Sequence, residues 1–192
     1  MIILYNPRAT KPRNRRFPLS IMALASVFEG KEEHAIIDGN VEDHATEAIL
    51  NLIHCNQVEL LAVTVMPGPQ MAAAIVTCRE IRARHPEVPI VWGGYFPSIY
   101  TDAALNARYV DFAARGQGEE TLVELLSALR GNGKSEDIRG LSFKDTFGLH
   151  RHNPERMMKP PDAFPWPPFH RLPVEKYLRP SFFGKRTAAH HA

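Results

Sequence analysis

The sequence has 192 residues, which is long enough for one domain with a substantial core plus an extension. Its formal net charge of +2, with 23% charged residues, argues against a nucleic-acid partner, because such a surface usually carries a clustered basic excess. No apolar run reaches the roughly 18 residues of a membrane span, and the first residues lack the charged start of a signal peptide. We therefore expect a cytoplasmic protein without a membrane span.

Five short apolar runs alternate with helical patterns over residues 1–130. The runs are Ile2 to Tyr5, Ala35 to Asp38, Leu60 to Val65, Ile90 to Trp92 and Tyr109 to Ala113. Apolar residues recur at helical spacing after each run, around residues 21–28, 43–53, 75–81, 102–108 and 122–129. Because parallel strands need a crossover that carries a helix onto the sheet, we predict a five-stranded parallel sheet covered on both faces. The expected fold class is α/β, doubly wound, flavodoxin-like or Rossmann-like.

The pattern changes after residue 130. Residues 131–153 are predicted to form a β-hairpin that turns near Gly148 and is appended to the sheet domain. In residues 154–192, eight of the sixteen prolines of the chain lie between Pro154 and Pro180. Neither a helix nor a strand can run far through so many prolines. We predict an extended strap that packs against another surface, because it is also rich in aromatic residues.

The most informative strand end is the pair Gly93 and Gly94, which follows the buried run Ile90 to Trp92. Glycine lets the chain adopt a positive φ and lets a ligand approach the backbone. In open parallel sheets, ligands bind in the crevice outside the carboxyl ends of the strands. Two interpretations stay open: the glycines floor a cofactor site, or they only form a tight strand-to-loop turn.

Common cofactor and catalytic motifs are missing. No glycine precedes Gly30, so the glycine-rich phosphate loops of NAD, FAD and ATP sites are absent, and Asp38 is interpreted as a turn or cap residue. The third run ends without the carboxylate of a phospho-receiver domain, and no G-x-S-x-G nucleophile motif occurs. Cys55 and Cys78 lack C-x-x-C spacing and are interpreted as small core residues. We expect a domain that holds a cofactor, with no catalytic residue and no metal ligand.

The loop after the first run is basic. Five arginine and lysine residues lie between Arg8 and Arg16. They could contact a phosphate, although a solvated, partly disordered loop is the interpretation that we favour.

Four motifs lie at strand ends in a fixed order. They are Asn6-Pro7, Ile37-Asp38, Gly93-Gly94-Tyr95-Phe96-Pro97-Ser98 and Arg115-Gly116-Gln117-Gly118-Glu119. Each motif alone is weak, but together they are fairly specific. Over nearly its whole length, the chain resembles the N-terminal cobalamin-binding domain of class B radical SAM enzymes.

The resemblance implies that loops at the strand ends contact the corrin and its nucleotide tail. The expected cofactor-binding residues are Asn6, Pro7, Thr64, Val65, Met66, Gly68, Gly93, Gly94, Tyr95, Arg115, Gly116, Gln117, Gly118 and Glu119. The cobalamin mutases place a cobalt-ligating histidine in Asp-x-His-x-x-Gly after the first strand, whereas residues 6–16 contain no histidine. The resemblance therefore implies base-off cobalamin without a protein histidine ligand. Phe96 stands where many relatives have histidine and receives no ligating role, and the apolar Met66 suits a face against cobalt.

The resemblance also implies a second half that this sequence lacks. Such enzymes continue into a barrel that begins with Cys-x-x-x-Cys-x-x-Cys, whose thiolates hold a [4Fe-4S] cluster that cleaves S-adenosylmethionine. The sequence ends with His190-His191-Ala192, and we interpret the histidine pair as the lead-in to that barrel. The expected partner is this C-terminal radical SAM domain. The complete enzyme is expected to transfer a methyl group from methylcobalamin to an unactivated carbon, although some relatives carry out ring chemistry instead.

Two other functions stay open on the sequence alone. One is a non-catalytic α/β interaction domain, and the other is a domain that binds a nucleotide sugar in the same crevice. Both would explain the glycine pairs at 93–94 and 116–118 as turn chemistry only.

Overall fold

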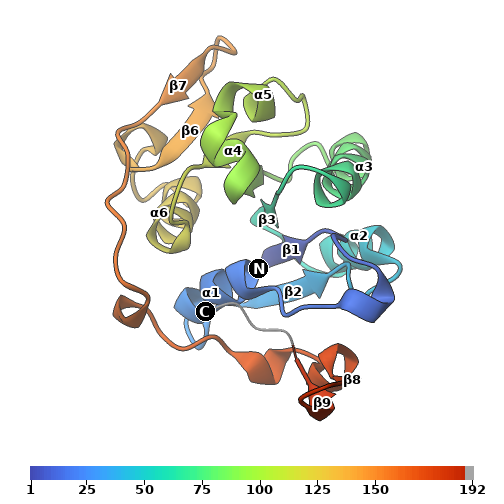
Figure 1. The fold of residues 1–192 in the computed structure, drawn as a ribbon. Helices are drawn as coiled ribbons and strands as arrows, with labels where there is room; N and C mark the ends of the chain where they lie inside the picture. The colour runs from blue at the N-terminus through green and yellow to red at the C-terminus, as the bar shows by residue number, and fades with distance from the viewer. Residues whose placement is uncertain (189–192) are drawn as a thin grey trace.

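The computed structural model describes residues 1–188, and its centre is a seven-stranded sheet with the order β2-β1-β3-β4-β5-β6-β7 (Figure 1). Its first five strands are parallel: β1 (Ile2–Asn6), β2 (His34–Asp38), β3 (Leu60–Thr64), β4 (Ile90–Gly93) and β5 (Phe112–Ala114). The predicted fold class is confirmed, and the parallel part has the flavodoxin-like strand order. All five carboxyl ends meet at one edge of the sheet, which we call the carboxyl edge.

The predicted hairpin belongs to the same sheet and is not an appendage to it. Its strands β6 (Leu141–Lys144) and β7 (His150–His152) are antiparallel and turn through Gly148, which has a φ of +78°. β6 pairs with β5, and Leu141 and Phe143 of β6 are buried in the core of the parallel strands. The sheet is therefore extended to seven strands because these apolar side chains continue its core.

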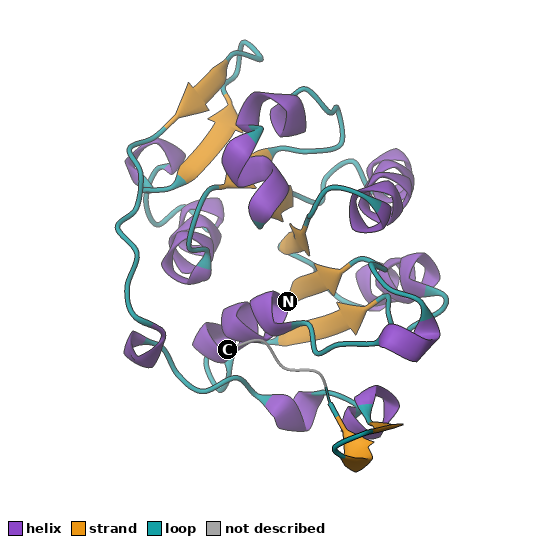
Figure 2. Ribbon diagram, in the orientation of Figure 1, coloured by secondary structure: helices purple, strands orange, loops and turns teal. Residues whose placement is uncertain are grey.

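The helices cover both faces of the sheet (Figure 2). α1 (Leu19–Phe28) packs against α6 (Glu119–Leu129) on one face. α2 (Ala45–Cys55), α3 (Pro69–Arg84), α4 (Tyr95–Ile99) and α5 (Thr101–Leu105) lie on the other. Right-handed crossovers explain why α1 lies opposite α2, α3, α4 and α5, because the chain moves from β1 to β2 in one direction and then returns across the sheet in the other. The rule does not apply to α6, since it connects β5 to the antiparallel β6. Among the helices of residues 1–188, none has the length and apolar character that crossing a membrane demands.

The segment 154–188, which we call the strap, runs from β7 past α6 and α1 to the outer side of β2 (Figure 1). It contains three short 3₁₀ helices (Pro161–Ala163, Phe169–Arg171 and Val174–Tyr177) and a small hairpin of β8 (Arg179–Ser181) and β9 (Gly184–Thr187). Leu172 and Tyr177 are buried against Met22 of α1, as predicted from the aromatic content. In contrast, the side chains of Trp166 and Phe182 are 91% and 98% exposed. The histidine pair at 190–191 lies outside the described residues.

Several local predictions are wrong. Cys55 is exposed, and only Cys78 is a core residue, where burial raises the pKa of its thiol to about 12. The fifth strand begins at Phe112 and not at Tyr109. Helix α4 was not predicted, and it contains Pro97 in its first turn, where a missing amide proton costs little.

The basic loop is also held more firmly than expected. The guanidinium groups of Arg8 and Arg15 donate hydrogen bonds to the carbonyl oxygens of Gly39 and Asn40, at 2.8 and 2.7 Å. These contacts tie the loop after β1 to the turn after β2.

Candidate functional site

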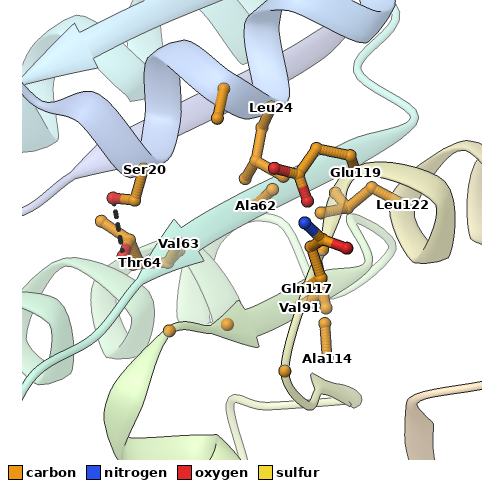
Figure 3. A pocket seen from close by; sticks show the side chains of 15 residues that line it. Ser20, Leu24, Ala62, Val63, Thr64, Val91, Ala114, Gln117, Glu119 and Leu122 are labelled. Atoms are coloured by element: carbon orange, nitrogen blue, oxygen red, sulfur yellow. Dashed lines mark hydrogen bonds between the residues drawn. The ribbon is translucent and has the colours of Figure 1, made fainter. Parts of the chain in front are cut away.

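A cavity of about 160 Å³ opens at the carboxyl edge, between α1, α6 and the ends of β3, β4 and β5 (Figure 3). Its walls are formed by Ser20, Ala23, Leu24, Ala62, Val63, Thr64, Val91, Gly93, Gly94, Ala114, Gly116, Gln117, Gly118, Glu119 and Leu122. Most of these residues are apolar, and the polar ones lie at the end of β3, on the loop after β5 and at the starts of α1 and α6. The position is the one where ligands bind in open parallel sheets.

Small side chains at the strand ends create the cavity. Successive side chains point to opposite faces of a strand, and the last ones on the α1 and α6 face are Thr64, Gly93 and Ala114. Figure 3 shows Leu24 of α1 and Leu122 of α6 beside this space. Since the strands contribute so little volume here, the two helices are left with a hollow between them and the sheet.

The two glycines at the end of β4, Gly93 in the strand and Gly94 after it, have different reasons to be glycine. Gly94 has a φ of +90°, and a Cβ there would lie 3.0 Å from the Thr64 hydroxyl oxygen and 3.3 Å from the Val65 backbone. The tight turn by itself therefore explains Gly94. A Cβ on Gly93 would meet only Ala114, at an ordinary 3.8 Å, and would stand at the wall of the cavity. Of these two glycines, Gly93 is therefore the one whose missing side chain leaves room in the cavity.

The loop after β5 is fixed to its neighbours. The Gly116 amide donates to the Ser98 hydroxyl at 2.9 Å, and the Gln117 side chain forms two hydrogen bonds with the backbone of Lys159 in the strap, at 2.8 and 2.9 Å. The Lys159 ammonium beside Glu120 lowers the pKa of that carboxyl. This loop is thus fastened to the strap where it forms the mouth of the cavity.

A second group of polar residues lies at the ends of β1 and β2. Asn6 and Asp38 are 5% and 4% exposed, and the Asn6 amide donates to the Asp38 carboxylate at 2.7 Å. Asp38 also accepts from the backbone of Asn40, so the predicted turn role is correct but incomplete. The Tyr177 hydroxyl donates to the other carboxylate oxygen at 2.7 Å, and burial together with this negative charge raises the pKa of Tyr177.

The structure brings about half of the predicted cofactor-binding residues to the cavity: Thr64, Gly93, Gly94, Gly116, Gln117, Gly118 and Glu119. Met66, Gly68 and Tyr95 are exposed beside it on the carboxyl edge, and the buried Val65 bonds through its backbone to Gly93 and Phe96. Asn6 and the buried Pro7 lie at the end of β1. The Arg115 guanidinium donates to the carbonyl of Asn153 and is therefore directed toward the hairpin.

Sequence reasoning missed the helical side of the cavity. Ser20, Ala23 and Leu24 of α1 and Leu122 of α6 line it, but their helical spacing indicated only core packing. A usable signal was present in the strands, because the last inward residues of three adjacent strands are all small.

The family model described as the B12 binding domain matches residues 6–126, which include the cavity and the β1 end. The chain belongs to the B12-binding domain family. The resemblance seen in the sequence is thereby confirmed.

Two curated relatives extend this result. The chain is 28% identical over 163 residues to an uncharacterized methyltransferase of Pyrococcus horikoshii, covering 83% of this chain and 35% of that protein. It is 25% identical over 160 residues to the anaerobic magnesium-protoporphyrin IX monomethyl ester cyclase of Synechocystis, covering 80% of this chain and 31% of that protein. The chain thus spans about a third of the length of the curated relatives that it matches.

Solved structures show the same fold. The cobalamin-dependent S-adenosylmethionine radical enzyme OxsB, with aqua-cobalamin and S-adenosylmethionine bound, superposes with a TM-score of 0.71 at 23% identity, covering 82% of this chain and 22% of that one. The radical S-adenosylmethionine methyltransferase TsrM of Kitasatospora setae, with cobalamin and a [4Fe-4S] cluster bound, gives a TM-score of 0.70 at 20% identity, covering 97% and 36%.

Proposed function

We propose that this chain binds cobalamin at the carboxyl edge, in the base-off form, with the nucleotide tail in the cavity between α1, α6 and the sheet. The observation that carries the proposal is that cavity in a B12-binding domain: it is apolar, and it is walled by small residues at three adjacent strand ends. An aromatic base needs such an apolar slot with a few polar groups near its mouth.

Different cavity residues would provide the space, the apolar contacts and the polar groups for the nucleotide tail. Gly93 and Ala114 leave room for a flat group, while Leu24 and Leu122 offer it an apolar contact on the helix side. The Ser20 hydroxyl, which donates to Thr64 at 3.3 Å, stands with Gln117 and Glu119 among the polar groups of the walls (Figure 3).

The corrin itself would lie outside the cavity, over the loops of the carboxyl edge. Met66 and Tyr95 are 55% and 58% exposed there and present apolar surface to a ligand. Among the described residues, no histidine lines the cavity, and residues 6–16 of the loop after β1 contain none, so we expect neither part of the site to supply a histidine ligand to cobalt. Within residues 1–188, no group of three or more histidine, cysteine, aspartate or glutamate residues is arranged to hold a metal ion. When bound, the cobalt of the cofactor would supply the methyl-carrying chemistry, and this chain would position it.

For the whole protein we propose a radical SAM enzyme, most simply a methyltransferase of an unactivated carbon, working in the cytoplasm. The names of the relatives support this extension, and the [4Fe-4S] cluster and S-adenosylmethionine would then bind in a C-terminal radical SAM domain. This chain alone, with only Cys55 and Cys78, offers no set of three closely spaced thiolates for such a cluster.

The direct test is to mix the purified chain with hydroxocobalamin, remove free corrinoid by desalting, and record the visible spectrum. Retained corrinoid with a base-off spectrum is the expected result. A spectrum of histidine-ligated cobalt would contradict the absence of a protein ligand. No retention under oxidising or reducing conditions would overturn the proposal and favour the interaction domain or the nucleotide-sugar domain.

A further inference from the structure

A chain of four hydrogen bonds, three of them buried, connects the strap to the loop after β3. It begins at the Tyr177 hydroxyl, which donates to Asp38, and continues through the Asn6 amide, which donates to the same carboxylate. The Gln70 amide then donates to the Asn6 oxygen at 2.8 Å. At its far end, the Gln70 oxygen accepts the backbone amide of Met66 at 2.8 Å.

Every side chain in this relay is almost fully buried. Tyr177 is 2% exposed, Asp38 4%, Asn6 5% and Gln70 6%. Buried polar groups are costly when they lose a partner, so a satisfied chain of them favours one arrangement over all others. The relay is therefore a rigid connection between two segments that lie more than a hundred residues apart in the sequence.

The segment at the far end is held on one side by the backbone bonds of Val65 and on the other by the Gly68 carbonyl, which accepts the Ala72 amide. Between these two points, the relay holds the Met66 amide. Residues 66–68 are exposed, and Gly68 has a φ of +101°. Apart from its chain neighbours, no atom of residues 1–188 lies within 4 Å of where a Cβ on Gly68 would stand. The Met66 amide is the point at which the relay holds this segment, while the Met66 side chain faces solvent.

We infer that the strap sets the position of residues 66–68 through this relay, so that Tyr177, Asp38, Asn6 and Gln70 are positioning residues for the corrin-facing loop. The role of this loop in cofactor binding rests on the proposed function. The coupling between the strap and the loop does not, and it can be measured in the chain without cofactor. Any movement of the strap away from β2 would then loosen a loop of the cofactor site.

Packing of the strap does not need the hydroxyl group of Tyr177. The ring of Tyr177 packs against Phe17, with 4.8 Å between the ring centroids, and belongs to an apolar cluster with Met22 and Leu172. Tyr177→Phe therefore removes the start of the relay and keeps the ring that anchors the strap. Gln70→Met removes the other end at similar size.

The coupling is tested without cofactor by hydrogen–deuterium exchange of the full chain. Tyr177→Phe and Gln70→Met should both increase exchange in the peptide covering residues 65–68. Thr77→Val is the matched control: it breaks a different buried set of hydroxyl contacts, to Tyr5 and Thr46, and should leave this peptide unchanged. Unchanged exchange in Tyr177→Phe would overturn the inference, whether or not the chain binds a corrinoid.

The functional part is tested with hydroxocobalamin titrations of the same variants. A hydrogen bond worth about 1.4 kcal/mol corresponds to a tenfold change in the dissociation constant. We therefore expect about tenfold weaker binding for Gln70→Met and a smaller loss of affinity for Tyr177→Phe. The double variant should bind better than the product of the two losses predicts, because both changes break one relay. Strictly additive losses, or equal losses in Thr77→Val, would overturn the positioning role. If wild type binds no corrinoid but Tyr177→Phe still loosens the loop, the proposed function fails and the coupling stands.

Discussion

The two edges of the parallel sheet, the carboxyl edge where the strands end and the amino edge where they begin, differ in the side chains that line them. At the carboxyl edge, β3, β4 and β5 end in small residues, and a cavity lies above them. At the amino edge, Arg130 bridges Glu32 and Glu59 with nitrogen to oxygen distances of 2.6 to 2.9 Å, and the amino group of Met1 also contacts Glu59. Charged side chains occur at both edges, but the strand ends that form the cavity are lined mostly by small and apolar residues.

This difference shows where function is to be sought in such a fold. Partly exposed ion pairs such as those at the amino edge usually contribute about 0–1 kcal/mol each, so they fasten the strand starts without forming a binding site. At the carboxyl edge, in contrast, small residues leave a cavity that larger side chains would have filled. Changes at the two edges should therefore separate ligand binding from stability.

The largest expected effect comes from filling the cavity. Ala23→Leu places three extra carbons where Ala23 of α1 lines the cavity, while the chain can still fold because the space is already there. The leucine would overpack the cavity only when the nucleotide tail is also there, and overpacking costs about 1–3 kcal/mol. We therefore expect hydroxocobalamin binding to weaken up to about 100-fold, with no loss of thermal stability of the free chain.

Ala83→Leu is the matched control for this change. It adds the same atoms to an exposed position in the last turn of α3, near the amino edge. This variant should bind like wild type. Equal binding by Ala23→Leu and wild type would show that the cavity is not part of the cofactor site.

A smaller effect is expected from Gly93→Ala. The new methyl group would make only ordinary contact with Ala114, and a glycine to alanine change in a compatible backbone stabilises by about 0.4–1 kcal/mol. Binding should weaken about tenfold, an effect of about 1.4 kcal/mol, because the methyl group stands in the cavity wall. Titration and thermal unfolding of one sample measure both effects.

Gly94→Ala provides the contrast within the same turn. Its φ of +90° and the 3.0 Å approach to Thr64 predict a loss of stability with or without cofactor. If Gly93→Ala is the variant that unfolds and Gly94→Ala is tolerated, the assignment of the two glycines is wrong.

The sequence was sufficient for the parallel sheet because each strand is a continuous apolar run between helical patterns. It also indicated the carboxyl edge, since Gly93 and the glycines at 116 and 118 follow strands. It did not reveal Leu24 or Leu122, because a helical apolar stripe looks the same whether it packs on a core or lines a hollow. The contact between Tyr177 and Asp38 was equally invisible, since these residues are separated by 139 positions and no local pattern connects them.

The smallest effect is expected at the amino edge, from Glu59→Gln. Hydrogen bonds from Arg130, and then the Met1 amino group, lower the pKa of Glu59 from 4.5 to about 2 despite its partial burial. Because the folded state has the lower pKa, folding favours the ionised carboxylate: its stabilisation is complete above about pH 4.5 and is lost as the pH falls toward 2. Urea unfolding at pH 7 should show Glu59→Gln less stable than wild type by about 1 kcal/mol, and the difference should shrink at pH 3. Hydroxocobalamin binding at pH 7 should stay at the wild-type value, because Glu59 lies at the opposite edge from the cavity. A drop in affinity as large as that of Gly93→Ala would mean that the two edges are coupled through the sheet.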